Sequence, residues 1–259
     1  MDLEPYLRRI EYDGPRTPSA AVLRGLHRQH LFTVPFENLD IPLKTPIRLE
    51  RQLIYEKIVV RRRGGFCYEL NGLFYELLTG LGFKVVMLSA RVRRENGGFG
   101  PEFDHMLLKV ELEEPWLVDV GFGDSFVNPV LFRSGSGDEI NGHRYLVATA
   151  DDEWELLRQD GQGQVALYRF RDVPRQLSDY EEMCLFHQTA PESHFTKSWI
   201  CSKATPEGRI TLANMRLIIT RDGLREENVL TQAEVRRCLR DQLGIQLPAS
   251  VDLSALSTG

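Results

Sequence analysis

The hydrophobic pattern of this 259-residue chain changes its period near residue 84, and that change limits the folds that the chain can adopt. In the first third of the chain, apolar residues recur at helical spacing, as they do from Leu70 to Leu81. From residue 84 to about residue 190 they alternate or form short runs between turn residues, which is typical of strands. Helices followed by a block of strands predict an α+β protein whose strands form a small antiparallel barrel. The strands predicted for this barrel are 84–92, 105–112, 116–122, 144–148, 154–157 and 165–170.

The last part of the chain mixes strands with one helix. Thr231 and Glu234 form a capping box that opens this helix, and Gly244 is a suitable residue to end it. A turn is predicted at 134–137, and the tail after Pro248 is expected to be weakly ordered. We therefore expect three domains, which are an N-terminal helical bundle at 1–83, a central antiparallel β-barrel at 84–190 and a C-terminal α/β lid at 191–259.

Charge and composition argue against several classes of function. A net charge of −5 makes nucleic acid an improbable main partner. The segment Met1–Pro5 is acidic and no apolar core follows it, so no signal peptide is expected. No run of about 18 apolar residues predicts a membrane-spanning helix. The four cysteines are too few and too scattered for a disulfide framework, and we expect a cytoplasmic protein with reduced thiols.

Cys67 is the residue with the strongest chemical signature. It follows Gly64 and Gly65 and begins the apolar run with helical spacing. Paired glycines let the chain turn sharply and approach other backbone closely, because no Cβ is in the way. A cysteine at a helix N-terminus meets free N–H groups and the positive end of the helix dipole, which favour a thiolate. A cysteine taken alone is more often a core residue, but this context favours a nucleophile.

His105 and Asp119 are the candidate partners of this nucleophile. His105 begins one predicted strand, and Asp119 lies among valines in the next, where a carboxylate is costly to bury unless it is paired. If the two strands pair antiparallel with an even register, both side chains lie on one face together with Gly121, whereas an odd register separates them. A Cys–His–Asp set supplies a nucleophile, a base and a group that orients the base.

Five segments together resemble the arylamine N-acetyltransferases: Arg63–Asn71, Asp104–Leu108, Val118–Gly123, Val34–Leu39 and Gln188–Phe195. The resemblance implies a helical bundle, a barrel and a lid around a cysteine-protease-like core. It also implies an enzyme that moves an acetyl group from acetyl-coenzyme A through a thioester on Cys67, with ping-pong kinetics. The acceptors would be arylamines, arylhydrazines or N-hydroxyarylamines. His105 would accept the proton of the acceptor, and Asp119 would orient the imidazole.

Binding residues follow from the same resemblance and from proximity to these segments. An arylamine pocket should be apolar and aromatic, although any of its candidates could instead be a core residue; they are Phe36, Phe103, Asp104, Phe122 and Phe126. The candidates for contact with coenzyme A are Pro101, Glu102, Phe186 and Ser193. Glu37 is expected to pair with an arginine such as Arg63 as structural support.

No metal is expected. Cys184, His187, His194 and Cys201 have irregular spacing that does not match a zinc site. Other functions remain open at this stage. They are an amide synthase of the same family that closes a macrolactam, a Cys–His–Asp amidase or transglutaminase-like enzyme, and a silent binding protein, which the intact Cys67, His105 and Asp119 disfavour. The sequence sets no oligomeric state.

Overall fold

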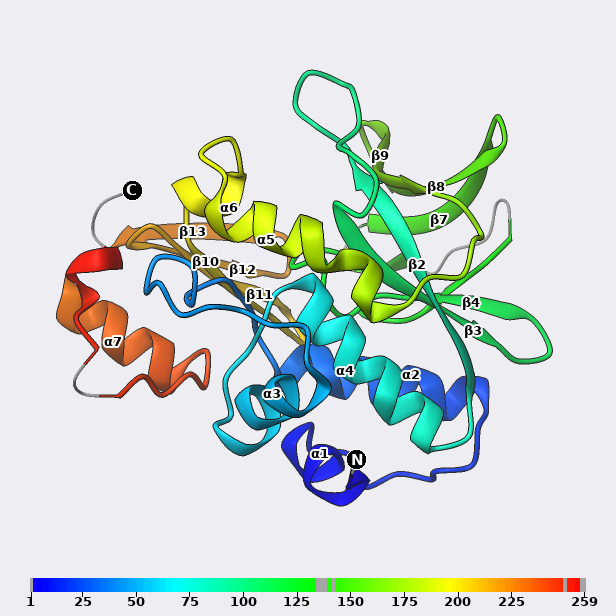
Figure 1. The fold of residues 1–259 in the computed structure, drawn as a ribbon. Helices are drawn as coiled ribbons and strands as arrows, with labels where there is room; N and C mark the ends of the chain where they lie inside the picture. The colour runs from blue at the N-terminus through cyan, green and yellow to red at the C-terminus, as the bar shows by residue number, and fades with distance from the viewer. Residues whose placement is uncertain (1, 134–138, 141–142, 249–250, 257–259) are drawn as a thin grey trace.

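The computed structural model describes residues 2–133, 139–140, 143–248 and 251–256, and it has the expected α+β architecture (Figure 1). The predicted turn at 134–137 lies outside the described residues. The N-terminal part of the chain contains helices and one short strand, which are α1 (Leu3–Arg9), α2 (Ala20–Thr33), β1 (Phe36–Glu37), α3 (Arg51–Tyr55), the π-helix η1 (Glu56–Val60) and α4 (Cys67–Gly80). Ser19 caps α2 by accepting a hydrogen bond from the Val22 N–H at 3.3 Å.

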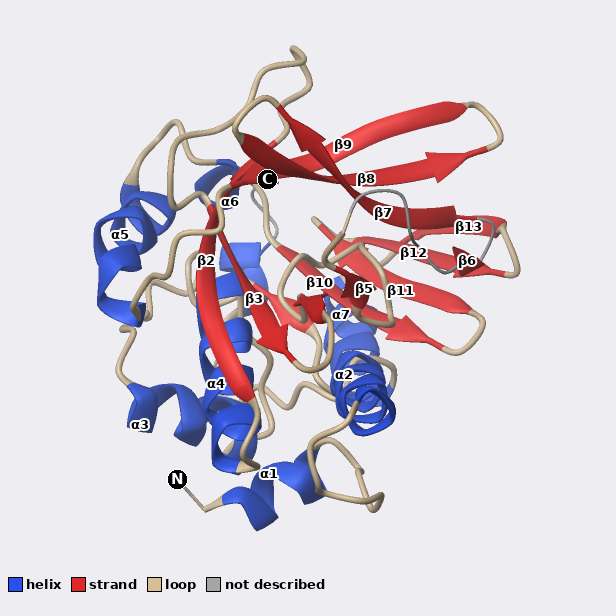
Figure 2. Cartoon of the chain, turned by 90° about the vertical axis from the view of Figure 1, so that its right-hand side faces the viewer, coloured by secondary structure: helices blue, strands red, loops and turns tan. Residues whose placement is uncertain are grey.

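The middle of the chain forms an eight-stranded antiparallel sheet in the order β5-β4-β3-β2-β9-β8-β7-β6. The strands are β2 (Lys84–Val92), β3 (His105–Glu111), β4 (Pro115–Val118), β5 (Val130–Leu131), β6 (Glu139–Ile140), β7 (His143–Ala150), β8 (Glu153–Asp160) and β9 (Gly163–Phe170). The sheet curls until β5 lies against β7, as expected for a nearly closed barrel (Figure 2). Side chains from both halves of the sheet fill its interior, Leu107, Leu117 and Tyr168 among them.

A helical segment joins this sheet to a second one. It contains the 3₁₀ helix η2 (Leu177–Tyr180), α5 (Glu181–Thr189) and α6 (His194–Lys197). The second sheet has the order β1-β10-β11-β12-β13, with β10 (Ile200–Thr205), β11 (Gly208–Ala213), β12 (Arg216–Arg221) and β13 (Leu224–Val229). It is followed by α7 (Gln232–Asp241) and the 3₁₀ helix η3 (Leu253–Leu256). Because β1 pairs with β10, the N-terminal segment contributes an edge strand to the C-terminal sheet.

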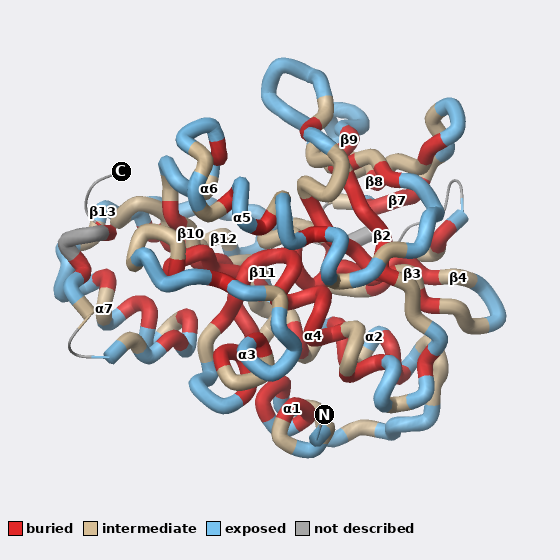
Figure 3. The backbone as a smooth tube through the Cα atoms, in the orientation of Figure 1, coloured by how far each residue is buried: buried red, intermediate tan, exposed pale blue. Residues whose placement is uncertain are grey.

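The main core lies between α4 and the face of the β2–β4 strands that carries Met87, Met106, Leu108 and Val118 (Figure 3). Buried residues of α1 and α2 belong to the same core, so side chains from helices and from the sheet surround α4. Within the part of the chain that the structure describes, no helix is long and apolar enough to cross a membrane.

Most predicted strands are present, and the exceptions have physical reasons. The strand expected at 116–122 ends at Val118, because the next backbone N–H groups bind side chains and not a neighbouring strand. Of the tail after Pro248, the structure describes residues 251–256, where Leu253 and Leu256 are buried and the Leu256 carbonyl accepts a hydrogen bond from Trp199 Nε1 at 2.7 Å. The domain boundaries at residues 83 and 190 stay predictions.

Candidate active site

Cys67 is the first residue of α4, as the sequence predicts, and it is only 4% exposed. The two glycines before it are required by close packing. A Cβ on Gly64 would lie 2.1 Å from the Pro35 carbonyl oxygen, and one on Gly65 would lie 2.9 Å from the Cβ of Glu69. Both distances are shorter than any contact that real Cβ atoms make, so only glycine lets the chain enter the helix along this path.

A buried network of charges fixes the start of this helix. Glu69 accepts a hydrogen bond from the Phe66 N–H at 3.2 Å and binds Lys57 Nζ at 2.8 Å. Lys57 also binds Asp40 at 2.7 Å, and Arg63 bridges Asp40 and Glu37 at 2.9 and 2.7 Å. The predicted Glu37–Arg63 pair is thus confirmed. Every charge in the network has an opposite partner, which offsets the cost of burying it.

His105 and Asp119 form a buried pair in which His105 Nε2 lies 2.7 Å from Asp119 Oδ2. Three further donors reach the carboxylate: Asn71 Nδ2 and the Gly121 N–H at 2.9 Å, and the Tyr168 hydroxyl at 3.1 Å. Burial alone would raise the pKa of Asp119, but the neighbouring His105, with the bonds from Asn71 and Gly121, lowers it below its ordinary value. Asp119 is therefore ionised and directed at the imidazole.

The pairing of β3 and β4 explains why these two side chains meet. Leu108 is opposite Val118, which is an even register, so odd-numbered residues of both strands share one face. Asp119 lies one residue beyond the end of β4, and His105 is the first residue of β3. The register condition set out from the sequence is met.

Gly121 connects Cys67 to this pair. A Cβ at Gly121 would lie 2.8 Å from the Cα of Cys67 and 2.7 Å from Asn71 Nδ2, so the loop that follows Asp119 packs directly on the head of α4. Burial raises the pKa of the Cys67 thiol, and Asp119 adds to that effect, whereas a hydrogen bond with the Met106 backbone opposes it. Burial at this helix terminus therefore opposes the thiolate that the sequence suggests.

The aromatic candidates for the acceptor pocket have different surroundings. The rings of Phe122 and His105 pack edge to face, with 5.2 Å between their centroids. Phe36 packs near Gly123, in the loop that follows Asp119. Phe126 is 1% exposed, belongs to the cluster of buried side chains inside the curled sheet and stacks on His27, with 5.5 Å between ring centroids.

Phe103 and Asp104 lie in the loop that leads into His105. The Phe103 N–H donates to Ser89 Oγ, and its carbonyl accepts from the Tyr68 hydroxyl, both at 2.7 Å. Tyr68 follows the nucleophile in sequence, so this bond ties the loop of the base to the helix of Cys67. The backbone of Phe103 has a φ of +65°, a strained value for a bulky residue that these two bonds stabilise.

The four candidates for contact with coenzyme A are in different settings. Pro101 is exposed, Glu102 lies 3.4 Å from an Arg175 nitrogen, and Phe186 is 36% exposed on α5. Ser193 is buried, and its hydroxyl caps α6 through the Phe195 N–H at 3.2 Å. The Ser193 hydroxyl therefore makes its hydrogen bonds within the protein.

Three residues of the site were missed from the sequence. Asn71 accepts a hydrogen bond from the Val120 N–H at 3.0 Å and also donates one to Asp119. Its position one helical turn after Cys67 is the feature of the sequence that could have indicated this role. Tyr168 comes from β9, and no local pattern marks it. His27 Nε2 accepts from the Asp119 N–H at 3.3 Å and Nδ1 contacts the Val127 carbonyl at 3.0 Å, while burial lowers the pKa of His27 to about 4.

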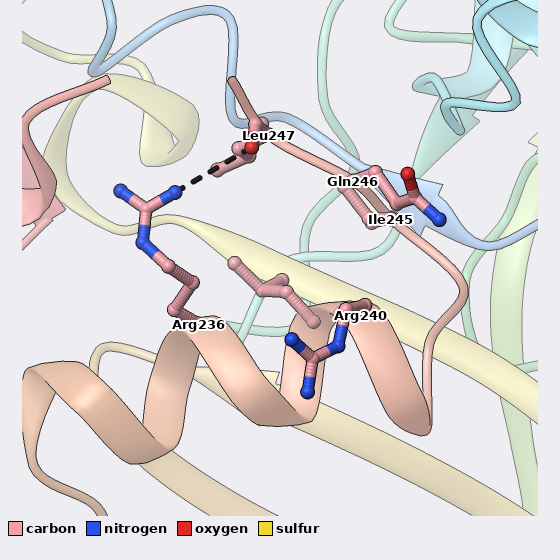
Figure 4. A pocket seen from close by; sticks show the side chains of 6 residues that line it. Arg236, Arg240, Ile245, Gln246 and Leu247 are labelled. Atoms are coloured by element: carbon pink, nitrogen blue, oxygen red, sulfur yellow. Dashed lines mark hydrogen bonds between the residues drawn. The ribbon is translucent and has the colours of Figure 1, made fainter. Parts of the chain in front are cut away.

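Other possible sites contain none of this chemistry. All four cysteines are free, and no group of three or more His, Cys, Asp or Glu side chains among the described residues is arranged to bind a metal. A hollow of about 310 Å³ beside α7 is lined by Arg236, Leu239, Arg240, Ile245, Gln246 and Leu247 (Figure 4). A larger one, of about 820 Å³, lies between residues 40–48, η1 and the C-terminal segment. Neither is lined by Cys67, His105 or Asp119.

Comparison with known proteins agrees with this geometry. A family model described as N-acetyltransferase matches residues 19–251. The arylamine N-acetyltransferase of Escherichia coli is 34% identical over 248 residues, which is 94% of this chain and 88% of that protein. A Salmonella typhimurium protein named arylamine N-acetyltransferase / N-hydroxyarylamine O-acetyltransferase is 30% identical with the same coverage. The structure of Mycobacterium marinum arylamine N-acetyltransferase in complex with CoA matches with a TM-score of 0.91 and 32% identity, over 99% of this chain and 97% of that one. This chain therefore belongs to the arylamine N-acetyltransferases, a family of acyltransferase enzymes.

Proposed function

We propose that this enzyme transfers the acetyl group of acetyl-coenzyme A to arylamines, arylhydrazines or N-hydroxyarylamines through a thioester on Cys67. The observation that carries the proposal is the buried His105–Asp119 pair, with the loop of Asp119 packed through Gly121 on the Cα of Cys67. This arrangement supports a site at the head of one helix in which Cys67 is the nucleophile, His105 the base and Asp119 the carboxylate that orients the base. The relatives named above support the acetyl donor and the class of acceptor.

In the first half-reaction, His105 takes the proton of the Cys67 thiol and the sulfur attacks the thioester carbonyl of acetyl-coenzyme A. The tetrahedral intermediate collapses, the bond from the carbonyl carbon to the sulfur of coenzyme A breaks, and the leaving thiolate takes the proton from His105. Asp119 stabilises the imidazolium that exists between these two proton transfers. The products are acetyl-Cys67 and free coenzyme A.

In the second half-reaction, the acceptor nitrogen, or the oxygen of an N-hydroxyarylamine, attacks the acetyl carbon on Cys67. His105 receives the proton that the acceptor loses, and the bond between the carbonyl carbon and Cys67 Sγ breaks. The proton then returns to the sulfur. Phe122, whose ring edge faces His105 at 5.2 Å, is positioned to contact an aromatic acceptor at this point.

We also propose that three parts of the chain have different roles in the site. Residues 1–83 carry the nucleophile, residues 84–190 carry its base and orienting carboxylate, and residues 191–259 cover the site as a lid. The pairing of β1 with β10 connects the first of these parts to the third.

Initial-rate kinetics test the proposal. With acetyl-coenzyme A and an arylamine varied together, double-reciprocal plots should be parallel, because coenzyme A leaves before the acceptor binds. Without acceptor, coenzyme A should be released once per enzyme and then stop. Intersecting plots, with no coenzyme A released until the acceptor is added, would rule out the covalent route.

A further inference from the structure

The segment from Asp119 to Val127 runs past the candidate site and is held at both of its ends. At the first end, the Val120 N–H donates to Asn71 Oδ1 at 3.0 Å, and the Asp119 N–H donates to His27 Nε2 at 3.3 Å. At the last end, the Val127 carbonyl lies 3.0 Å from His27 Nδ1. The stretch between these two ends needs contacts of its own to hold its position.

Phe122 is the residue of this stretch whose side chain faces the candidate base. Its ring centroid lies 5.2 Å from that of His105 and 5.2 Å from that of Tyr168. The next residue, Gly123, has a φ of +86°, a conformation that residues with a Cβ rarely adopt. The backbone therefore turns directly after Phe122, and the direction of its ring depends on where Gly123 is held.

One face of the second sheet holds this turn. Ser202 pairs with Phe36 on one side and with Thr211 on the other, so their side chains share a face. Arg209 lies two residues before Thr211 in β11 and shares that face too. A Cβ at Gly123 would lie 3.5 Å from the Phe36 ring. The Arg209 guanidinium donates to the Gly123 carbonyl oxygen, and to Ser202 Oγ at 3.1 Å, so it ties the turn to the sheet.

Asp124 gives Arg209 a second hold on the turn. Its Oδ1 lies 3.0 Å from Arg209 Nε, and the two side chains are 69% and 15% exposed. Asp124 also faces Arg158, whose Nη1 lies 4.0 Å from Oδ2, so loss of Arg209 leaves no carboxylate buried without a partner. Ser202 Oγ would keep its hydrogen bond with Thr211 Oγ1 at 2.8 Å. We therefore expect the fold to tolerate a substitution of Arg209.

We infer that Arg209 is a positioning residue that acts through Gly123: it fixes the Phe122 ring at the place where an aromatic acceptor binds. This inference rests on the proposed function, in which only the second half-reaction involves an aromatic ring. Asp119 is held by other residues, so acetylation of Cys67 does not depend on Arg209. Loss of Arg209 should therefore slow the reaction of acetyl-Cys67 with aromatic acceptors and no earlier step.

The two half-reactions are measured separately in Arg209→Gln. With acetyl-coenzyme A alone, the burst of released coenzyme A gives the rate of acetylation, which should stay within about twofold of the wild type. The acetylated enzyme, freed of small molecules, is then mixed with 4-methoxyaniline, and loss of the acetyl group is followed by intact mass. This step should slow about ten- to hundredfold, because a misplacement on the order of 1 Å has an effect of that size. Hydrazine, which has no ring to contact Phe122, should remove the acetyl group at a rate within about twofold of the wild type.

Two further variants complete the test. Arg209→Lys keeps the positive charge but cannot reproduce the several hydrogen bonds of a planar guanidinium, so the arylamine step should slow by about three- to tenfold. Arg216→Gln is the matched control in the same sheet. The Arg216 side chain is 60% exposed and pairs with Glu227 at 3.3 Å, so the change there should leave both steps and both acceptors unaltered.

A purely structural role predicts a different result, since acetylation and the reactions with both acceptors would then slow together. That pattern, or a wild-type rate with the arylamine, would overturn the inference. If Arg209→Gln does not fold, as judged by circular dichroism, Arg209→Lys alone still decides, because an unchanged rate with the arylamine contradicts the inference. Failure of the proposed function looks different again, because the wild-type enzyme would then release no coenzyme A without an acceptor, and both proposals would fall together.

Discussion

Gly121→Ala should separate the nucleophile from its base. The added Cβ would lie 2.7 Å from Asn71 Nδ2, 2.8 Å from the Cα of Cys67 and 3.0 Å from the Cys67 carbonyl oxygen. The Cα and the carbonyl oxygen of Cys67 belong to the backbone of α4, which cannot move aside. Asn71 Nδ2 is held by its hydrogen bonds to Asp119 and to the Met106 carbonyl. The loop after Asp119 must therefore move away from the helix.

The size of the effect follows from that displacement. Contacts of this kind become acceptable only after a shift on the order of 1 Å, and a misplacement of that size costs about 10²-fold in rate. The overpacking should also lower the free energy of unfolding by ~1–3 kcal/mol. We expect kcat/KM for acetyl transfer to fall about a hundredfold, with most of the loss in kcat.

Steady-state kinetics and urea unfolding measure both effects. Gly161→Ala is the matched control, because a Cβ at Gly161 meets nothing within 4 Å and the same change there should leave both values unaltered. Wild-type kcat/KM in Gly121→Ala would refute the reasoning, since the contact between Cys67 and the loop of Asp119 would then have no role in catalysis.

Three further changes test other parts of the account. Cys67→Ala should reduce acetyl transfer at least about a thousandfold while circular dichroism stays native, and residual activity of a few per cent would count against a covalent route. Asp119→Asn should slow acetylation of the enzyme by about 10²–10⁴-fold in a single turnover, because an amide cannot stabilise the imidazolium; acetylation at the wild-type rate would show that another group orients His105. Burial lowers the pKa of His27 from 6.5 to about 4 in the folded protein. As the pH falls, the His27 imidazole is therefore protonated in the unfolded chain before it is protonated in the folded protein. The free energy of unfolding should consequently fall by ~3 kcal/mol between pH 6.5 and pH 4. His27→Gln should reduce the slope of that part of the stability profile measured by urea unfolding without removing it, because burial also lowers the pKa of His30 well below its ordinary value; an unchanged slope would contradict the assignment.

Much of the site could be predicted from the sequence because its main elements are local. Gly64 and Gly65 mark the entry to α4, and the hydrophobic pattern places His105 at the start of β3. Both residue numbers are odd, so the sequence predicts that His105 and Asp119 share a face if the register of β3 and β4 is even. The register itself comes from the structure.

The parts that the sequence could not supply depend on distant pairing and burial. Tyr168 reaches Asp119 only because β9 lies beside β2, an arrangement that no local pattern specifies. Phe126 is a core residue because His27, from a helix a hundred residues earlier, covers its ring. The burial of Cys67, which raises the pKa of its thiol, likewise depends on the packing of the whole chain and is not indicated by the residues around it.

Isolation of the acetylated enzyme tests whether the acetyl group passes through Cys67. The protein is incubated with acetyl-coenzyme A, freed of small molecules, digested and mapped by mass spectrometry, and a second portion is mixed with an arylamine alone. We expect one acetyl group on the peptide that contains Cys67, and its complete transfer to the arylamine without coenzyme A. An acetyl group on another residue, or one on Cys67 that the arylamine cannot remove, would contradict it.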